Sequence, residues 1–152
     1  MKRITLFAGT VFILLSSYSL SQDKGFGLGV IAGEPTGVSA KYWMSSLTAI
    51  DAALAWSFVD QGALHIHADY LFHNFHLLNF ETKGKWPVYY GIGARLKFGE
   101  NDTKLAIRIP IGAEYMFYDA PVDIFLEIVP MLELIPKTKF QFNAAIGVRF
   151  FF

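Results

Sequence analysis

The sequence predicts an all-β fold: an eight-stranded antiparallel transmembrane β-barrel with a charged, side-chain-filled lumen. Three observations lead to this prediction. A period-two alternation of apolar and other residues recurs in eight segments after residue 22. From Phe26 onward, one face of all eight segments carries no charged residue, whereas the opposite face collects both signs of charge. No later apolar run is long enough for a membrane-spanning helix, whereas tilted strands of about 9 to 11 residues are long enough to cross.

The N-terminus has the pattern of an export signal. A basic start at residues 1–3 precedes an apolar run at 4–15 that is too short to cross a bilayer as a helix. Small residues before Gln22 suit a signal peptidase, so we expect a signal peptide over 1–21 and one barrel domain over 22–152. A buried N-terminal helix is the alternative. The chain contains no Cys, so an exported domain of this size has no disulfide to stabilise it.

The eight predicted strands are separated by turn-forming residues. The strands cover residues 24–33, 38–44, 49–58, 64–73, 86–98, 104–117, 123–134 and 139–152. Gly, Pro, Asn, Asp and Ser favour turns, and they gather at 34–37, 45–46, 60–62, 99–102, 118–121 and 136–138. One connection, at about 74–85, is longer. Pro110 and Pro130 lie inside predicted strands, where each removes a ladder donor, so we expect a local bulge at both.

Alternation justifies each strand in turn. The apolar face carries Phe26, Leu28 and Val30 in the first segment, Val38, Tyr42 and Met44 in the second, Ile50, Leu54, Trp56 and Phe58 in the third, Tyr70 and Phe72 in the fourth, Val88, Ile92, Leu96 and Phe98 in the fifth, Ile107, Ile109 and Tyr115 in the sixth, Leu126, Ile128 and Leu132 in the seventh, and Phe142, Ile146 and Phe150 in the eighth. On the opposite face we assign ten charged residues to the lumen, five basic and five acidic: Lys41, Asp51, Asp69, Arg95, Lys97, Arg108, Glu114, Glu127, Glu133 and Arg149.

The composition of the two faces indicates which of them is inside. Large aromatic residues lie near the strand ends of the apolar face, and Gly and Ala lie between the charges of the other, which favours lipid outside and a crowded lumen inside. Backbone groups in lipid must all be paired, so the sheet has to close. A soluble sandwich or lipocalin-like barrel is the alternative. Side chains fill an eight-stranded barrel, so we expect the ten charged residues to plug it as an ion-pair network. Trp43 falls on the same face and is large for that space.

The stretch from residue 64 to 73 places His65, His67 and Asp69 at alternate positions, followed by His73. Imidazole and carboxylate groups on one side of a strand are candidate ligands for Zn or Ni, although a third ligand would have to come from another strand. The alternatives are hydrogen-bonded lumen groups, which we favour, and a proton-linked switch of the lumen. We therefore predict no metal, no cofactor and no catalytic residue, with His65, His67 and Asp69 as weak metal candidates.

Four stretches, GEPTGVSAKYW, LHIHADYLFHNF, VYYGIGARLKFG and NAAIGVRFFF, resemble small bacterial outer-membrane barrels of the OmpA/OmpX type, and the resemblance covers the chain from residue 22 to its end. It implies a bacterial outer-membrane location and no established chemistry. The terminal Val148, Phe150 and Phe152 are similar to the strand signal read by the barrel-assembly machinery. The resemblance departs from the usual pattern in one respect, because the predicted outer loops are short.

These observations lead to an expected role and its alternatives. We expect a non-enzymatic outer-membrane protein with a structural or interaction role. A small gated, porin-like channel is the alternative, and an enzyme acting on lipid at the membrane edge is a third reading. The expected partners are outer-membrane lipid, the assembly machinery during insertion, and a periplasmic protein at residues 74–85. Nucleic acid is not an expected partner, because the sequence has no basic run and its formal net charge is zero.

Overall fold

The computed structural model describes residues 24–58 and 62–152, so the proposed signal peptide and part of the turn at 60–62 lie outside the described residues. Within these ranges the chain forms nine strands: β1 (Phe26–Gly33), β2 (Thr36–Trp43), β3 (Thr48–Ser57), β4 (Ala63–Asn74), β5 (Val88–Phe98), β6 (Thr103–Arg108), β7 (Ile111–Met116), β8 (Val122–Ile135) and β9 (Lys139–Phe151). The described residues contain no helix that is long and apolar enough to cross a membrane.

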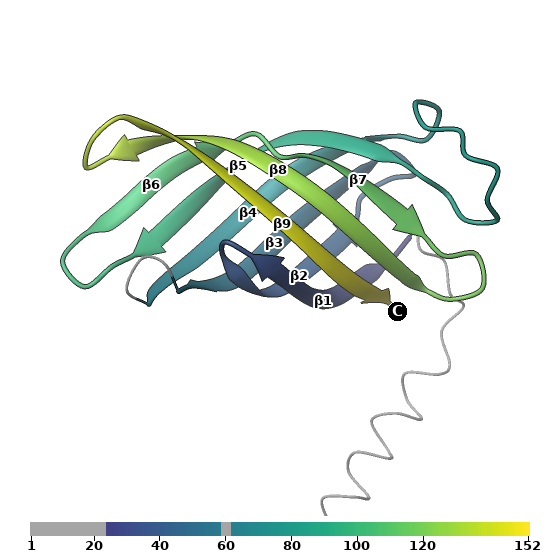
Figure 1. Ribbon diagram of the computed structural model, residues 1–152, viewed down its shortest axis with the longest axis horizontal. Coiled ribbons are helices and arrows are strands. Elements are labelled where there is room, and N and C mark those ends of the chain that lie inside the picture. The colour runs from purple at the N-terminus through teal and green to yellow at the C-terminus, as the bar shows by residue number, and fades with distance from the viewer. Residues whose placement is uncertain (1–23, 59–61) are drawn as a thin grey trace, which may run out of the picture.

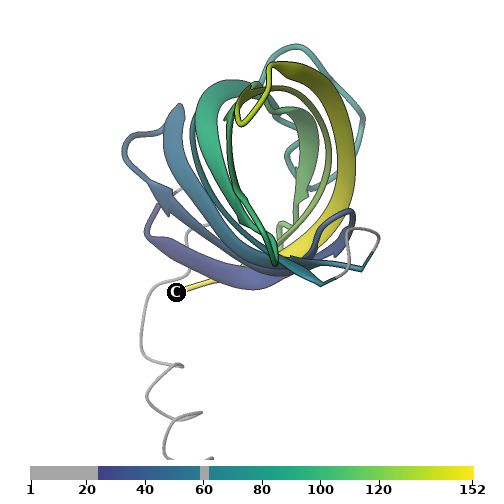
Figure 2. The ribbon, with the colours of Figure 1, turned by 90° about the vertical axis from the view of Figure 1, so that its left-hand side faces the viewer.

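The sheet closes into a ring of eight strand positions, which confirms the predicted fold (Figures 1 and 2). Every strand pairs antiparallel with its neighbour, and β1 pairs with β9 from Gly27↔Phe151 to Gly33↔Ala145 to close the ring. β6 and β7 share one position, because both pair with β5 on one side and with β8 on the other.

Two prolines explain why this position is divided into β6 and β7. Pro110 accepts a bond from the Gly91 N–H at 3.0 Å but has no N–H to return to β5. Pro130 of β8 accepts a bond from the Ile109 N–H at 3.0 Å and likewise cannot return one. Both missing donors therefore fall beside the break between Arg108 and Ile111, and the pairing resumes after it.

The bulges expected at Pro110 and Pro130 are both wrong. At Pro110 the strand is interrupted, but its register with β5 is the same before and after the break, Gly93↔Arg108 and Tyr90↔Ile111. β8 pairs with β9 without a shift along its whole length, including Pro130↔Phe142. The register shift on this side lies instead between Leu105 and Ala106, where β6 meets β8. Pro130 is tolerated because its ring nitrogen lies beside the gap between β6 and β7, where no ladder donor is required.

The connections divide the barrel into two ends. The terminal end holds the start of β1, the end of β9 and the connections 44–47, 75–87 and 117–121. The far end holds the connections 34–35, 99–102 and 136–138, together with the end of β3 and the start of β4. Because β1 and β2 are short, residues 139–143 of β9 pair only with β8 among the described strands, and the β8–β9 hairpin projects beyond the wall at the far end (Figure 1).

The apolar face points outward and the charged face points inward. On the outside, Val30, Leu54, Ile92 and Leu126 are each more than half exposed. On the inside, even the most exposed of the ten predicted lumen residues, Glu127, is only 8% exposed. Charged side chains are almost never this buried unless they are paired, so the lumen has to supply partners for them.

Glycines make room for large aromatic rings in the lumen, and a cluster of apolar residues closes its terminal end. A side chain at Gly147 would overlap the Phe125 ring, and one at Gly112 would overlap the Tyr89 ring, so both rings lie directly against backbone. At the terminal end, Trp43 is only 4% exposed and belongs to a cluster that closes the lumen, which we call the apolar floor: Trp43, Ala49, Met116 and Phe151, with Phe75 packed against it. The large indole therefore fits at the end of the lumen and not in its middle.

Candidate functional site

The structure places all ten charged residues predicted for the lumen inside the barrel, together with other inward-facing groups. These are His73 on β4, Tyr89 on β5 and Asp123 on β8, which are buried, and Gln141 on β9, which is partly buried. Hydrogen bonds and ion pairs join these side chains into three groups along the barrel axis, which we call the terminal, middle and far clusters.

The terminal cluster is built around Arg149 of β9, whose guanidinium contacts three carboxylates. Nε donates to Asp123 Oδ1 at 3.1 Å, Nη1 to Asp51 Oδ2 at 2.5 Å and Nη2 to Glu114 Oε2 at 3.1 Å. The guanidinium also lies 4.1 Å from the centroid of the Phe125 ring, which is a cation–π distance. One side chain therefore connects β3, β7 and β8 to β9.

Lys41 of β2 completes the terminal cluster. Its Nζ donates to Glu114 Oε2 at 2.6 Å and lies 4.3 Å from the centroid of the Trp43 ring in the apolar floor. The same Nζ is 2.9 Å from His73 Nε2. An ammonium group has no acceptor, so Nε2 must accept and the proton of His73 lies on Nδ1, which is 3.3 Å from the Leu47 carbonyl oxygen. His73 is therefore a neutral bridge between Lys41 and the backbone.

The middle cluster joins β4, β5, β6 and β8. Arg108 Nε donates to Asp69 Oδ1 at 2.9 Å, and Arg108 Nη2 donates to Glu127 Oε1 at 3.4 Å. The Tyr89 hydroxyl donates to Glu127 Oε2 at 2.9 Å. His67 lies beside the pair, with its Nε2 atom 3.9 Å from Asp69 Oδ2.

The far cluster uses an amide as an intermediary. Arg95 Nη2 donates to Gln141 Oε1 at 3.0 Å, and Gln141 Nε2 donates to Glu133 Oε2 at 3.1 Å, whereas Arg95 and Glu133 are 4.0 Å apart. Lys104 lies 3.9 Å from Glu133 with 29% of its side chain exposed. Lys97 of β5 is buried opposite His65 of β4 in the strand register.

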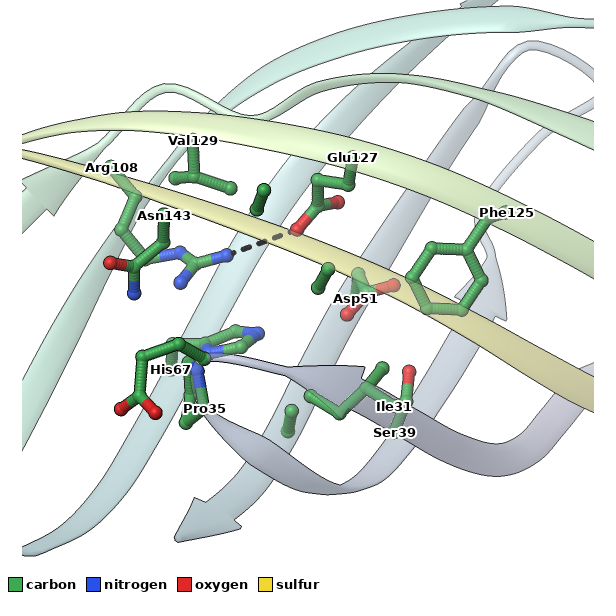
Figure 3. Close-up of a pocket in the computed structure, with 14 residues that line it drawn as sticks. Ile31, Pro35, Ser39, Asp51, His67, Arg108, Phe125, Glu127, Val129 and Asn143 are labelled. Atoms are coloured by element: carbon green, nitrogen blue, oxygen red, sulfur yellow. Dashed lines mark hydrogen bonds and ion pairs between the residues drawn. The ribbon is translucent and has the colours of Figure 1, made fainter. Parts of the chain in front are cut away.

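A cavity separates the terminal and middle clusters (Figure 3). Asp51, Glu127 and Arg108 line it from β3, β8 and β6, and Ser39 and His67 line it from β2 and β4. The volume open to the centres of water-sized groups is about 20 Å³, which is room for about one or two such groups. Within the described residues, Ser39 Oγ and His67 Nδ1 are buried and have no hydrogen-bond partner.

The weak metal candidates do not assemble into a binding site in the described part of the chain. His65, His67 and Asp69 follow one another on the inward side of β4. Across residues 24–58 and 62–152, no three His, Asp or Glu side chains lie close enough together to hold a metal ion. The Nε–H of Arg108 instead donates a bifurcated hydrogen bond to both carboxylate oxygens of Asp69, at 2.9 and 3.1 Å.

Asp123, which the prediction omitted, and Gln141 share the inward frame of their strands. Asp123 precedes Phe125 and Glu127 at the same spacing, and Gln141 precedes Asn143 and Ala145. The frame alone could have identified Asp123 as an inward carboxylate. It could not have shown that Gln141 links Arg95 to Glu133, because that link depends on how far β5, β8 and β9 are shifted relative to one another along the barrel axis.

A second hollow lies outside the lumen at the terminal end. The long connection 75–87 folds beside the β2–β3 turn and encloses an open groove of about 460 Å³, lined in part by Leu47, Phe75 and Lys85. Trp86 holds the connection in place: its ring lies 4.7 Å from that of Tyr115, and its Nε1 donates to Thr82 Oγ1 at 2.8 Å. The groove is therefore an ordered feature of the connection.

Comparison with known proteins supports the architecture. No protein family matches the chain, and no curated protein sequence matches it. Among solved structures, the chain is similar to the N-terminal β-barrel domain of OprF from Pseudomonas aeruginosa, with a TM-score of 0.60 and 14% sequence identity, over 84% of this chain and 96% of that chain. At this identity the likeness establishes a shared β-barrel fold, in agreement with the fold predicted from the sequence.

Proposed function

We propose that this protein is an integral barrel of the bacterial outer membrane with a structural or interaction role and no enzymatic activity. The observation that carries the proposal is the inverted distribution of side chains: an uncharged, exposed apolar face surrounds a lumen of buried ion pairs. Lipid is the medium in which such an exterior is stable, because outward apolar and inward polar residues are typical of membrane barrels.

The lumen supports a plug in preference to an open pore. The three clusters follow one another along the barrel axis, and the apolar floor closes its terminal end. Eight strands leave an interior just wide enough for side chains to fill, and the cavity between the terminal and middle clusters has room for only about one or two water-sized groups. Ion flow would therefore require the pairs and the floor to rearrange.

Insertion would use the last strand. β9 closes the ring against β1, and Val148 and Phe150 lie on its outward face, each about two-fifths exposed. In the family that the sequence resembles, this pattern with a terminal aromatic residue such as Phe152 is read by the assembly machinery. We extend that role to Val148, Phe150 and Phe152.

The interaction role centres on the connection after β4. If the termini face the periplasm, the connection 75–87 and its open groove face it too. Leu77 and Phe80 are more than half exposed there. We propose that a periplasmic protein binds the region of residues 74–85. Deletion of 77–84 should abolish its capture in pull-downs from the periplasm, and unchanged capture would remove this part of the proposal.

The decisive experiment folds the chain from residue 22 in detergent and in liposomes. We expect heat-modifiable mobility on gels, partition with the lipid, and no steady conductance steps in planar bilayers. A molecule that is monodisperse in plain buffer would overturn the membrane location. Steady steps would favour the alternative, a small gated channel, which the polar lumen and its water-sized cavity support.

A further inference from the structure

We propose that the cavity between the terminal and middle clusters is a binding site for a small monovalent cation such as Na⁺ or K⁺, held together with water. The site lies inside the barrel wall, so the inference goes beyond the proposed function and does not depend on what the outer face contacts. Its walls come from strands far apart in the sequence, β1, β2, β3, β4, β6, β8 and β9, and from the turn at 34–35 (Figure 3).

The balance of charges around the cavity favours a bound cation. In the terminal cluster, the three carboxylates of Asp51, Glu114 and Asp123 face two cations, Lys41 and Arg149. In the middle cluster, Asp69 and Glu127 share the single cation Arg108. Each of these two clusters, as the described residues define it, therefore has one more negative than positive group. The matching excess of positive charge, Arg95, Lys97 and Lys104 against Glu133, lies in the far cluster, so the shortage is local to the cavity. Buried charge without a counter-charge is expensive, and the cavity lies where the two clusters meet.

Two buried polar atoms that lack a hydrogen-bond partner also favour a bound polar group, independently of the charges. Ser39 Oγ and His67 Nδ1 line the cavity on residues that are 1% and 6% exposed, and neither has a hydrogen-bond partner within the described residues. Buried polar groups are almost always satisfied by protein or ordered water. These atoms therefore indicate that a polar group occupies the space in front of them.

The donor set selects the kind of cation. Within the described residues, no three His, Asp or Glu side chains converge as a divalent or transition metal would require. Asp51, Glu127 and the Ser39 hydroxyl offer oxygen from separate walls, and in Figure 3 both carboxylates point into the same space. The gaps between them are suited to water, so a monovalent ion that keeps part of its hydration fits this chemistry.

The test compares cations of different size at equal ionic strength. The protein folded in detergent is unfolded with urea at about pH 8, above the ordinary pKa of histidine of about 6.5, in NaCl, KCl or N-methylglucamine chloride. We expect a higher unfolding midpoint in NaCl or KCl, saturating with concentration, and ²³Na NMR line broadening that added K⁺ reverses. Equal midpoints in all three salts, or a midpoint that responds to pH alone, would overturn the proposal and make the proton the counter-charge.

Two variants locate the effect. Ser39→Ala removes one oxygen from the cavity and should abolish most of the difference between sodium and N-methylglucamine. Glu133→Gln also removes a lumen oxygen anion, but in the far cluster and away from the cavity lining, so it should leave that difference unchanged. Loss of the difference in Glu133→Gln with retention in Ser39→Ala would refute this location. Neither result bears on the membrane location, which rests on the outer face.

Discussion

The two ends of the lumen pair their buried charges differently. In the terminal cluster, Arg149 contacts three carboxylates directly, and every partner is at most 6% exposed. In the far cluster, Arg95 reaches Glu133 through the amide of Gln141, and the Lys104 side chain is partly in solvent. The barrel wall explains the difference. All eight strand positions surround the terminal cluster. β1 and β2 end below the far cluster, so water can reach its polar groups from that side.

The comparison teaches that the two ends differ in what surrounds the ions and not in how deeply the ions are buried. Arg95 and Glu133 are 2% and 3% exposed, as deeply buried as the terminal cluster. At the far end, however, Gln141 is only partly buried and the Lys104 side chain is 29% exposed, so water reaches the groups around the ions. We therefore expect substitutions in the terminal cluster to cost more than substitutions in the far cluster.

The largest effect is expected at the terminal cluster. Arg149→Met leaves three buried carboxylates short of one cation, and breaking buried pairs in this way costs about 3–5 kcal/mol. Urea unfolding in detergent should show this loss, or no folded band at all. Arg149→Met combined with Asp123→Asn should recover part of it. A loss below about 1 kcal/mol would contradict the central place of Arg149.

The next effect concerns the outer face at two depths. Ile128→Arg, near the middle of β8, should cost about 2–4 kcal/mol in liposomes, because a charge at the bilayer midplane is costly. The matched Phe140→Arg, on the projecting hairpin, should cost about 0–1 kcal/mol, as expected near the interface. Tryptophan fluorescence during urea unfolding would measure both. Equal costs would argue against a membrane around the middle of the barrel.

A smaller effect is expected in the far cluster. Gln141→Ala removes two hydrogen bonds that link Arg95 to Glu133, but water can replace the amide at this end of the barrel. We expect a loss of about 1 kcal/mol, well below that of Arg149→Met in the same assay. A loss as large as that of Arg149→Met would show that the far cluster is as dry as the terminal one.

The smallest effect should come from Lys104→Ala. Its partner Glu133 is 3.9 Å away and the lysine side chain is partly exposed, so the pair resembles a surface ion pair worth about 0–1 kcal/mol. Added salt should change the stability of the protein and of the variant by similar amounts. A clear destabilisation that salt abolishes would reveal a stronger pair than the geometry indicates.

Sequence reasoning predicted the ring and its two faces because a period of two determines which side each residue faces. It missed the start of β2 because Gly37 was interpreted as a turn residue. In the structure Gly37 pairs with Ala55, and any side chain there would overlap the neighbouring strand. It also expected a bulge at Pro130, because the pattern does not show which neighbour a missing donor faces.

The contacts between clusters were less accessible to the sequence. The inward frame included the ten charged residues, yet the partners of Arg149 come from β3, β7 and β8, and their meeting depends on the stagger of the strands. The sequence contains no signal for that stagger. The neutral bridge formed by His73 depends on the Leu47 carbonyl in a turn, which no alternation pattern can predict.

The β8–β9 hairpin projects past β1 and β2 at the far end, and its turn at 136–138 is exposed. Nothing in the lumen rests on that turn, since Gln141 and Glu133 lie further down the two strands. A short epitope inserted there would be displayed without disturbing the ion pairs, and antibody labelling of intact cells would then report which way the barrel is oriented.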